Sequence, residues 1–351
     1  MKIGFWCRED HLLNNSIFLN VSEDASFNKN PQYNYLYNYL KSKGHEINSI
    51  DLISNVGEID CVLFLDFPAG KISKLAEKAL SHKKKILITI ENEVVLRSNW
   101  LRKNQDLFDL ILTWNDDFID NKKYFKIMLP SLDRHERDYN FLPFLEKKYL
   151  SCMISWKKKY KHKNETQTLK NKIINYFEEN NLKDNFHLYG PNWDETVFKY
   201  VSILEFLNYP RFKKFRKIIC KDRYKNWKGK TQDKRMTLRN YKFAFVIENA
   251  TDFNGFITDK IFDCFYSGTV PIYLGAKNVK LFIPEECFID LREFKNLNNL
   301  HDYLLNLDQA RYEIYIENIQ KFLSNKNSIF SFKYFNEAIL NALNFLKDRN
   351  N

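Results

Sequence analysis

The most constraining feature of the sequence is a regular alternation between short apolar runs and amphipathic helical patterns. In the first 130 residues, runs such as "CVLFLD" and "KILITI" are apolar throughout, while "YNYLYNYLKSKG" and "ISKLAEKALSHKK" have the periodicity of helices. Strands that are apolar on both faces and alternate with helices are typical of a parallel sheet covered on both sides. The sequence therefore predicts an α/β fold built on parallel sheets.

The same alternation starts again near residue 148, at "KYLSCMIS", and runs to the apolar segment "CFIDL", after which three helical patterns close the chain. We predict two Rossmann-like domains, residues 1–147 and 148–325, whose parallel sheets face a cleft. Residues 326–351 are expected to form a terminal helix that packs back across the domains. Two such domains with trailing helices are typical of the GT-B architecture of glycosyltransferases, although other two-lobed α/β proteins share this pattern.

The net charge of +11 suits a partner that carries phosphate: a nucleotide, a nucleic acid or an anionic membrane surface. A codon bias that enriches Lys and Asn would produce the same excess. The six cysteines are scattered without the spacing of a metal site, which indicates free thiols in a reducing cytoplasm.

The start of the chain, "MKIGFWCRED", is interrupted by charge too early for a signal peptide, and no apolar run approaches the roughly 20 residues that span a bilayer. We therefore expect a cytoplasmic protein, either soluble or peripheral on the inner face of the plasma membrane.

The stretch "FVIENATDFNGFITDKIFDCFYSGTVPIYLG" places a polar segment between two apolar strands. Thr258 is a good N-cap for a helix that ends before Gly268, and Asp259 in the first turn complements the helix dipole. Lys260 and the free N–H groups of the helix start form a site for phosphate oxygens. In an open parallel sheet this loop lies at the carboxyl ends of the strands, where ligands bind.

Helix capping alone would explain Thr258 and Asp259. It leaves unexplained why Glu248 and Asn249 end an otherwise buried strand, so we favour a ligand site. Three roles are open to Glu248: it contacts a bound sugar, it folds back on Lys260, or it caps the strand. We favour the sugar contact.

Residues 241–294, "YKFAFVIEN…GFITDKIFDCFYSGTVPIYLGAKNVKLFIPEECFIDLREF", resemble the donor-binding signature of the α-1,3/1,4-fucosyltransferases, glycosyltransferase family 10. The segments "LYGPNW" and "KKILITIENEV" resemble two further parts of that family. The resemblance implies an inverting transferase that moves L-fucose from GDP-L-fucose to O3 or O4 of an N-acetylglucosamine or glucose residue. Because the sequence shows no membrane anchor of the kind expected of a Golgi enzyme, we expect the acceptor to be a bacterial surface glycan, such as lipopolysaccharide O-antigen, or a glycoprotein.

The resemblance implies that Glu91, directly after the strand "ILITI", is the catalytic base, with Glu93 as the second choice. A carboxylate at the cleft edge can take the proton of an acceptor hydroxyl as its oxygen attacks the sugar. Without the resemblance, each would be read as a surface Glu at a strand end.

The implied donor site combines cations with polar side chains. Arg223 and Lys260 match the diphosphate-binding positions, and Asn249 and Asp259 match positions that hold the ribose and phosphates. The full donor-binding set that we predict is Arg223, Lys234, Glu248, Asn249, Phe256, Thr258, Asp259 and Lys260. No cofactor beyond the donor and no metal site are expected, so a divalent metal would at most be stimulatory.

Two departures from the family leave the donor sugar open. The family usually has Glu at the position of Asp259 and Tyr at the position of Phe256. The same fold acting on another GDP-deoxysugar is therefore the first alternative. A basic nucleic-acid-binding protein is the alternative from a different class, although we expect a nucleotide sugar and a glycan, and no nucleic acid, as partners.

Overall fold

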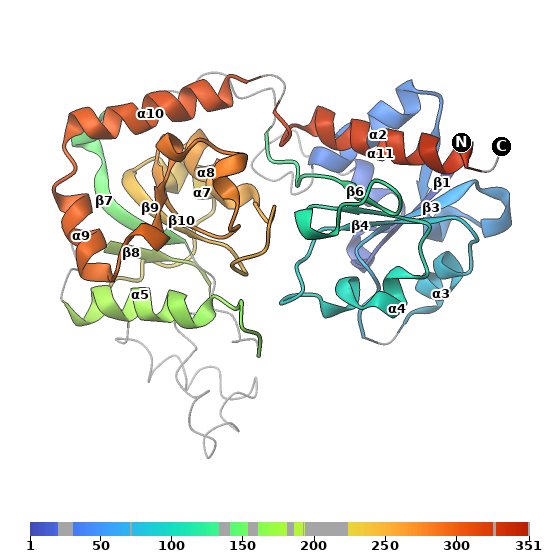
Figure 1. Cartoon of the computed structure of the whole chain (residues 1–351), viewed down its shortest axis with the longest axis horizontal. Helices are drawn as coiled ribbons and strands as arrows, with labels where there is room; N and C mark the ends of the chain where they lie inside the picture. The colour runs from blue at the N-terminus through green and yellow to red at the C-terminus, as the bar shows by residue number, and fades with distance from the viewer. Residues whose placement is uncertain are drawn as a thin grey trace, which may run out of the picture.

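The computed structural model describes residues 1–19, 31–70, 72–132, 141–153, 161–180, 186–191, 193, 224–325 and 328–349. Two domains lie side by side, and each is built around one parallel sheet (Figure 1). The predicted α/β fold with parallel sheets is therefore confirmed.

The sheet of the first domain has six parallel strands in the order β2-β1-β3-β4-β5-β6. The strands are β1 (Lys2–Cys7), β2 (Glu46–Ser49), β3 (Cys61–Leu65), β4 (Lys85–Thr89), β5 (Leu110–Thr113) and β6 (Tyr124–Lys126). The helices of this domain are α1 (Ser16–Leu19), α2 (Pro31–Ser42), α3 (Lys74–Leu80) and α4 (Arg102–Gln105). Since the strands run in parallel, the loops after them lie at one edge of the sheet.

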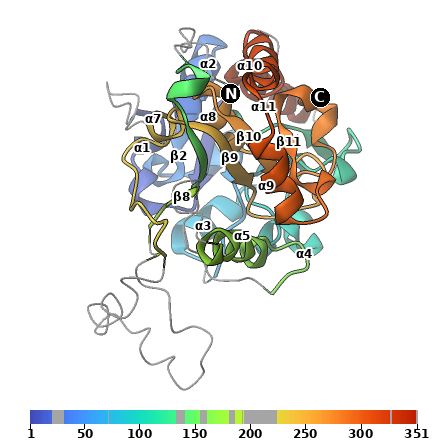
Figure 2. The ribbon, with the colours of Figure 1, turned by 90° about the vertical axis from the view of Figure 1, so that its left-hand side faces the viewer.

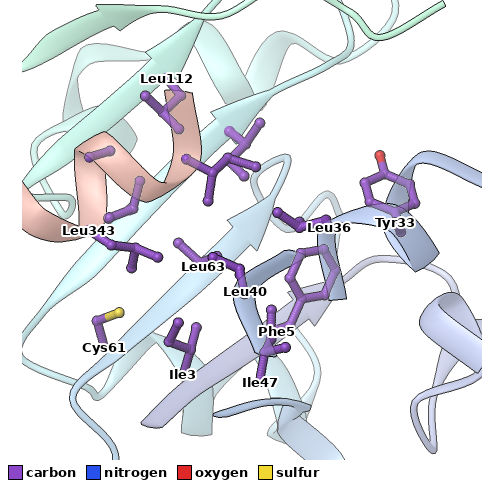
Figure 3. Close-up of a cluster of buried hydrophobic side chains, with 14 of the residues drawn as sticks. Ile3, Phe5, Tyr33, Leu36, Leu40, Ile47, Cys61, Leu63, Leu112 and Leu343 are labelled. Atoms are coloured by element: carbon purple, nitrogen blue, oxygen red, sulfur yellow. The ribbon is translucent and has the colours of Figure 1, made fainter. Parts of the chain in front are cut away.

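Both faces of this sheet are buried, which explains why its strands are apolar throughout. Side chains alternate between the faces, so Leu63 packs with α2 while its neighbours Val62 and Phe64 pack with α3. Figure 3 shows the first of these clusters, where Leu36 and Leu40 of α2 lie over the strands.

The sheet of the second domain has five parallel strands in the order β11-β10-β9-β7-β8. They are β7 (Lys148–Met153), β8 (Phe186–Tyr189), β9 (Tyr241–Ile247), β10 (Val270–Leu274) and β11 (Ile289–Asp290). The helices in the described part of this domain are α5 (Gln167–Glu179), α7 (Lys234–Leu238), α8 (Asp259–Tyr266), α9 (Leu297–Leu305) and α10 (Gln309–Leu323).

Helices also cover both faces of the second sheet. Phe243 and Phe245 of β9 pack with α5 and α9, whereas Ala244 and Val246 pack with α8. Figure 2, in which the second domain faces the viewer, shows α5, α8 and α9 around its strands. The loop after β9 therefore emerges between two covered faces and leads directly into α8.

The last helix, α11 (Phe332–Asp348), returns to the first domain. Its residues Phe335, Ile339 and Leu343 belong to the same buried cluster as β1, β3 and β4. Leu343 is labelled in this cluster in Figure 3. Helix α10 ends in the second domain, so the chain crosses back between Leu323 and Phe332. Within the described residues, no helix has both the length and the apolar character needed to cross a membrane.

Candidate active site

Helix α8 begins where the sequence predicts it to begin. Thr258 has extended backbone angles, and its hydroxyl accepts a hydrogen bond from the N–H of Lys260 at 3.5 Å. The buried face of the helix consists of Ile261, Cys264 and Phe265, and Gly268 follows with a φ of +62°. These apolar anchors fix the polar first turn of α8 at the carboxyl edge of the second sheet.

Glu248 follows β9 and is fully buried, with 0% of its surface exposed. Its carboxylate accepts hydrogen bonds from the Thr258 N–H at 2.9 Å and from the Thr258 hydroxyl at 2.8 Å, and it meets Lys260 Nζ at 2.6 Å. Both carboxylate oxygens are thus used within the chain. Of the three roles open to Glu248, the structure contains the fold-back onto Lys260.

Glu248 also determines the charge of Lys260. Burial lowers the pKa of Lys260, whereas the charge and the hydrogen bond of Glu248 raise it. The charges of Asp259 and Glu91 raise it further, and the net result is a pKa above the ordinary value for lysine. Lys260 is therefore a fixed cation at the start of α8. The contribution of Glu91 shows that this residue of the first domain lies within electrostatic range of Lys260.

The backbone of Glu91 is held by side chains of the first domain. Asp66 Oδ1 accepts the N–H groups of Ile90 and Glu91 at 2.7 and 3.1 Å. Trp100 Nε1 donates to the carbonyl oxygen of Glu91 at 3.1 Å, and Asn99 Nδ2 donates to it at 3.2 Å. Sequence reasoning missed Asp66 and Asn99, although the aspartate at the end of the apolar run "CVLFLD" was a visible signal.

Glu93, the second choice for the base, points to a different partner. Its carboxylate lies 4.0 Å from His162 Nε2 of the second domain. The two glutamates therefore face different neighbours, and only Glu91 is among the groups that act on Lys260.

Phe256 has a packing role that the sequence did not predict. The side chain is 2% exposed, and its ring lies 4.7 Å from the ring of Trp114, which follows β5 in the first domain. The structure thus places Phe256 between the domains, and its ring is not open to a donor. The packing of this ring on Trp114 removes apolar surface from water and so stabilises the contact between the domains.

Polar contacts join the two domains beside this aromatic pair. Asn254 donates to Asp117 at 2.8 Å, and Asn278 donates to Asp116 at 2.8 Å. Gly255 has a φ of +84°, and a Cβ at this position would lie 2.2 Å from the carbonyl oxygen of Trp114. The loop after β9 is therefore in direct contact with the end of β5.

Two other predicted donor residues meet each other at the surface. Lys234 Nζ lies 3.8 Å from Asp259 and 3.8 Å from Asp263, and the side chains of Lys234 and Asp259 are 60% and 63% exposed. Asn249 is partly buried directly after Glu248. Arg223 lies outside the described residues. Among the described residues, no group of three or more His, Cys, Asp or Glu side chains could hold a metal ion.

The fold has a counterpart among solved structures. The chain aligns with the crystal structure of an alpha1,3-fucosyltransferase with GDP-fucose at a TM-score of 0.52 and 16% sequence identity, covering 97% of this chain and 89% of that chain. At this identity the likeness concerns the fold, which is the predicted GT-B architecture of glycosyltransferases.

Sequence comparisons then identify the family that the chain resembles. Residues 206–350 match the family described as glycosyltransferase family 10 (fucosyltransferase) C-term. The Alpha-(1,4)-fucosyltransferase of Arabidopsis thaliana is 39% identical over 80 residues, which cover 22% of this chain and 20% of that protein. The Alpha-(1,3)-fucosyltransferase FucT of Helicobacter pylori is 34% identical over 73 residues, which cover 21% of this chain and 15% of that protein.

These matched segments span a fifth or less of the two relatives. The predicted resemblance to the α-1,3/1,4-fucosyltransferases of glycosyltransferase family 10 is confirmed.

Proposed function

We propose that this chain transfers L-fucose from GDP-L-fucose to a hydroxyl of a glycan, with inversion at the anomeric carbon. The observation that carries the proposal is the placement of Lys260, a cation fixed by buried Glu248 at the start of α8, within electrostatic range of Glu91 in the other domain. A cation and helix N–H groups suit a leaving diphosphate, and a carboxylate across from them suits proton removal.

In the proposed step, an acceptor oxygen forms a bond to the anomeric carbon while the bond from that carbon to the GDP oxygen breaks. The acceptor proton moves to Glu91, and GDP leaves with the electron pair of the broken bond. Lys260 and the N–H groups of α8 offset the charge that develops on the diphosphate, together with Arg223. We propose that these groups suffice without a metal ion or another cofactor.

The nucleoside is proposed to contact Asn249 and Asp259. Asp259 is exposed, and its carboxylate lies 3.8 Å from exposed Lys234, so it can exchange that ion pair for two ribose hydroxyls at small cost. After this exchange, Lys234 stays close to the phosphates of the donor. Thr258 acts indirectly, by fixing the first turn of α8.

The proposed acceptor is O3 or O4 of an N-acetylglucosamine or glucose residue in a bacterial surface glycan, such as lipopolysaccharide O-antigen, or in a glycoprotein. A peripheral position on the inner face of the plasma membrane would bring the enzyme to such an acceptor. The choice of O3 or O4 derives from the family resemblance.

The test is a transfer assay with purified protein, a panel of nucleotide sugars, and disaccharides ending in N-acetylglucosamine or glucose. Mass spectrometry should detect the gain of one deoxyhexose from GDP-fucose, and NMR of the product should show the inverted anomeric configuration. Lys260→Ala should weaken saturable GDP binding. Faster turnover of another GDP-deoxysugar would replace fucose as the donor.

A nucleic-acid-binding protein would behave differently in the same experiments. It would bind DNA or RNA with a steep dependence on salt and would show no sugar transfer. That combination of results would overturn the proposal.

A further inference from the structure

Asp66 is a buried carboxylate for which the proposed reaction has no use. It directly follows β3, is 7% exposed, and has a φ of +61°. From β1 the chain goes to β2 on one side and then crosses to β3 on the other, so the carboxyl ends of β1 and β3 form the topological switch point of the first sheet. Open α/β sheets bind their ligands at such points.

The two oxygens of Asp66 differ in what they contact. Oδ1 accepts hydrogen bonds from the N–H of Ile90, the N–H of Glu91 and Nδ2 of Asn99, at 2.7, 3.1 and 2.6 Å. Oδ2 makes no hydrogen bond to any residue in the described part of the chain. Since a buried carboxylate normally uses both oxygens, the second is available to a ligand.

Two further polar groups, each from a different element, lie within electrostatic range of Asp66. Burial raises the pKa of Asp66. The hydrogen bonds from Ile90, Asn99 and Glu91 lower it, and so does the charge of Arg8, which follows β1. Burial and then the charge of Asp66 raise the pKa of Tyr33, which lies on α2. A cation, a phenol and a carboxylate beside the backbone of Glu91 suit a ligand with several neutral hydroxyls.

We propose that Asp66 binds the acceptor sugar: Oδ2 accepts a hydrogen bond from a hydroxyl near the one that Glu91 deprotonates, while Oδ1 holds the backbone that carries Glu91. This inference rests on the proposed function and deepens it, because it assigns one acceptor contact to the switch point of the first domain. The same side chain thus ties the position of the base to the position of the acceptor.

Asp66→Asn is the main test. The amide keeps one oxygen for the backbone N–H groups and replaces Oδ2 by an NH2 group, so the acceptor hydroxyl loses a charged hydrogen-bond acceptor. We expect the KM for the acceptor to rise at least about tenfold, since a hydrogen bond to a charged group has this effect on affinity. The kcat and the KM for GDP-fucose should change much less.

The matched control is Asp109→Asn. Asp109 precedes β5 and accepts the N–H of Lys85 at 2.8 Å, at the opposite edge of the same sheet. The Asp109→Asn variant therefore also loses a charged acceptor of a backbone N–H, but this acceptor lies far from the proposed site. All kinetic constants of this variant should equal those of the wild type.

A series of monodeoxy acceptors identifies the hydroxyl. With the wild type, one analogue should lose about tenfold in kcat/KM, and with Asp66→Asn the same analogue should lose nothing further, because the contact is already absent. Asp66→Glu keeps the charge but moves it by one methylene. It should also raise the acceptor KM, which keeps the inference testable if Asp66→Asn does not fold.

The outcomes separate the inference from the proposed function. An Asp66→Asn enzyme with lower kcat and unchanged acceptor KM would reduce Asp66 to a purely structural role and overturn the inference alone. Equal losses for every deoxy acceptor in both enzymes would do the same. A wild-type protein that transfers fucose to no acceptor would overturn the proposed function, and the inference with it.

Discussion

Glu248→Gln tests whether a buried ion pair fixes Lys260. The carboxylate of Glu248 is fully buried, whereas 30% of the Lys260 side chain is exposed. Removing one partner of a fully buried pair costs about 3–5 kcal/mol, because the other charge is left without compensation. Since Lys260 reaches solvent and the amide can still bond Thr258, we expect Glu248→Gln to lower the free energy of unfolding by about 2 kcal/mol.

The same substitution changes the titration of Lys260. In the native chain Glu248 raises the pKa of Lys260 against the effect of burial, and in the variant burial remains without that opposing charge. A raised lysine pKa contributes stability that is fully present below the unfolded-state pKa and is lost as pH rises through the folded-state pKa. This loss at alkaline pH should therefore be present in the wild type and absent from Glu248→Gln.

Urea unfolding of a double-mutant cycle measures the effect. With Lys260→Met as the second variant, the coupling free energy should be about 2 kcal/mol, and calorimetry should show GDP affinity reduced about tenfold in Glu248→Gln. The control is Glu285→Gln, which removes an exposed contact to Lys280 and should leave the unfolding curve unchanged. Additive effects in the cycle would refute the ion-pair argument, and unchanged GDP affinity would refute the positioning role.

Three further predictions follow from single residues. Gly255→Ala should destabilise the protein by about 1–3 kcal/mol, because the new methyl group meets the Trp114 carbonyl, whereas Gly70→Ala, with a similar φ of +71° and open space, should cost less in the same urea assay. Glu91→Gln should lower kcat about 10²–10⁴-fold and leave calorimetric GDP affinity intact; retained transfer would remove Glu91 from the role of base. Burial lowers the pKa of Lys147 to about 7, so the unfolded chain binds more protons than the native one between about pH 7 and 10, and stability should rise with pH in this window. Lys147→Met should flatten that slope, and an unchanged slope would exclude Lys147 as its source.

The local sequence pattern was sufficient to predict the helices and strands of the fold. Continuous apolar runs predicted strands buried on both faces, and β3 shows why, since Leu63 faces one helix layer while Val62 and Phe64 face the other. The first turn of α8 was also predictable, because capping by Thr258 depends only on residues two or three positions away.

Contacts between distant segments could not be read from the same pattern. Phe256 and Trp114 are far apart in the chain, and nothing near either residue indicates that they pack together. Asp66 was missed for a similar reason, since its hydrogen bonds to Ile90 and Asn99 depend on how β3 and β4 pair.

The site therefore divides into residues that can reach a ligand and residues that hold them. The sequence analysis placed Glu248, Phe256 and Lys260 together in the donor site, but only Lys260 combines a fixed charge with exposure to solvent. Glu248 is fully buried and Phe256 is nearly so, and a side chain in that state contacts a ligand only if its present partners are given up. Since those partners are an ion pair and a large aromatic ring, the exchange would cost more than one new hydrogen bond returns. Substitutions at Glu248 and Phe256 should consequently change donor affinity through Lys260 and through domain placement, and not through a lost contact to the sugar.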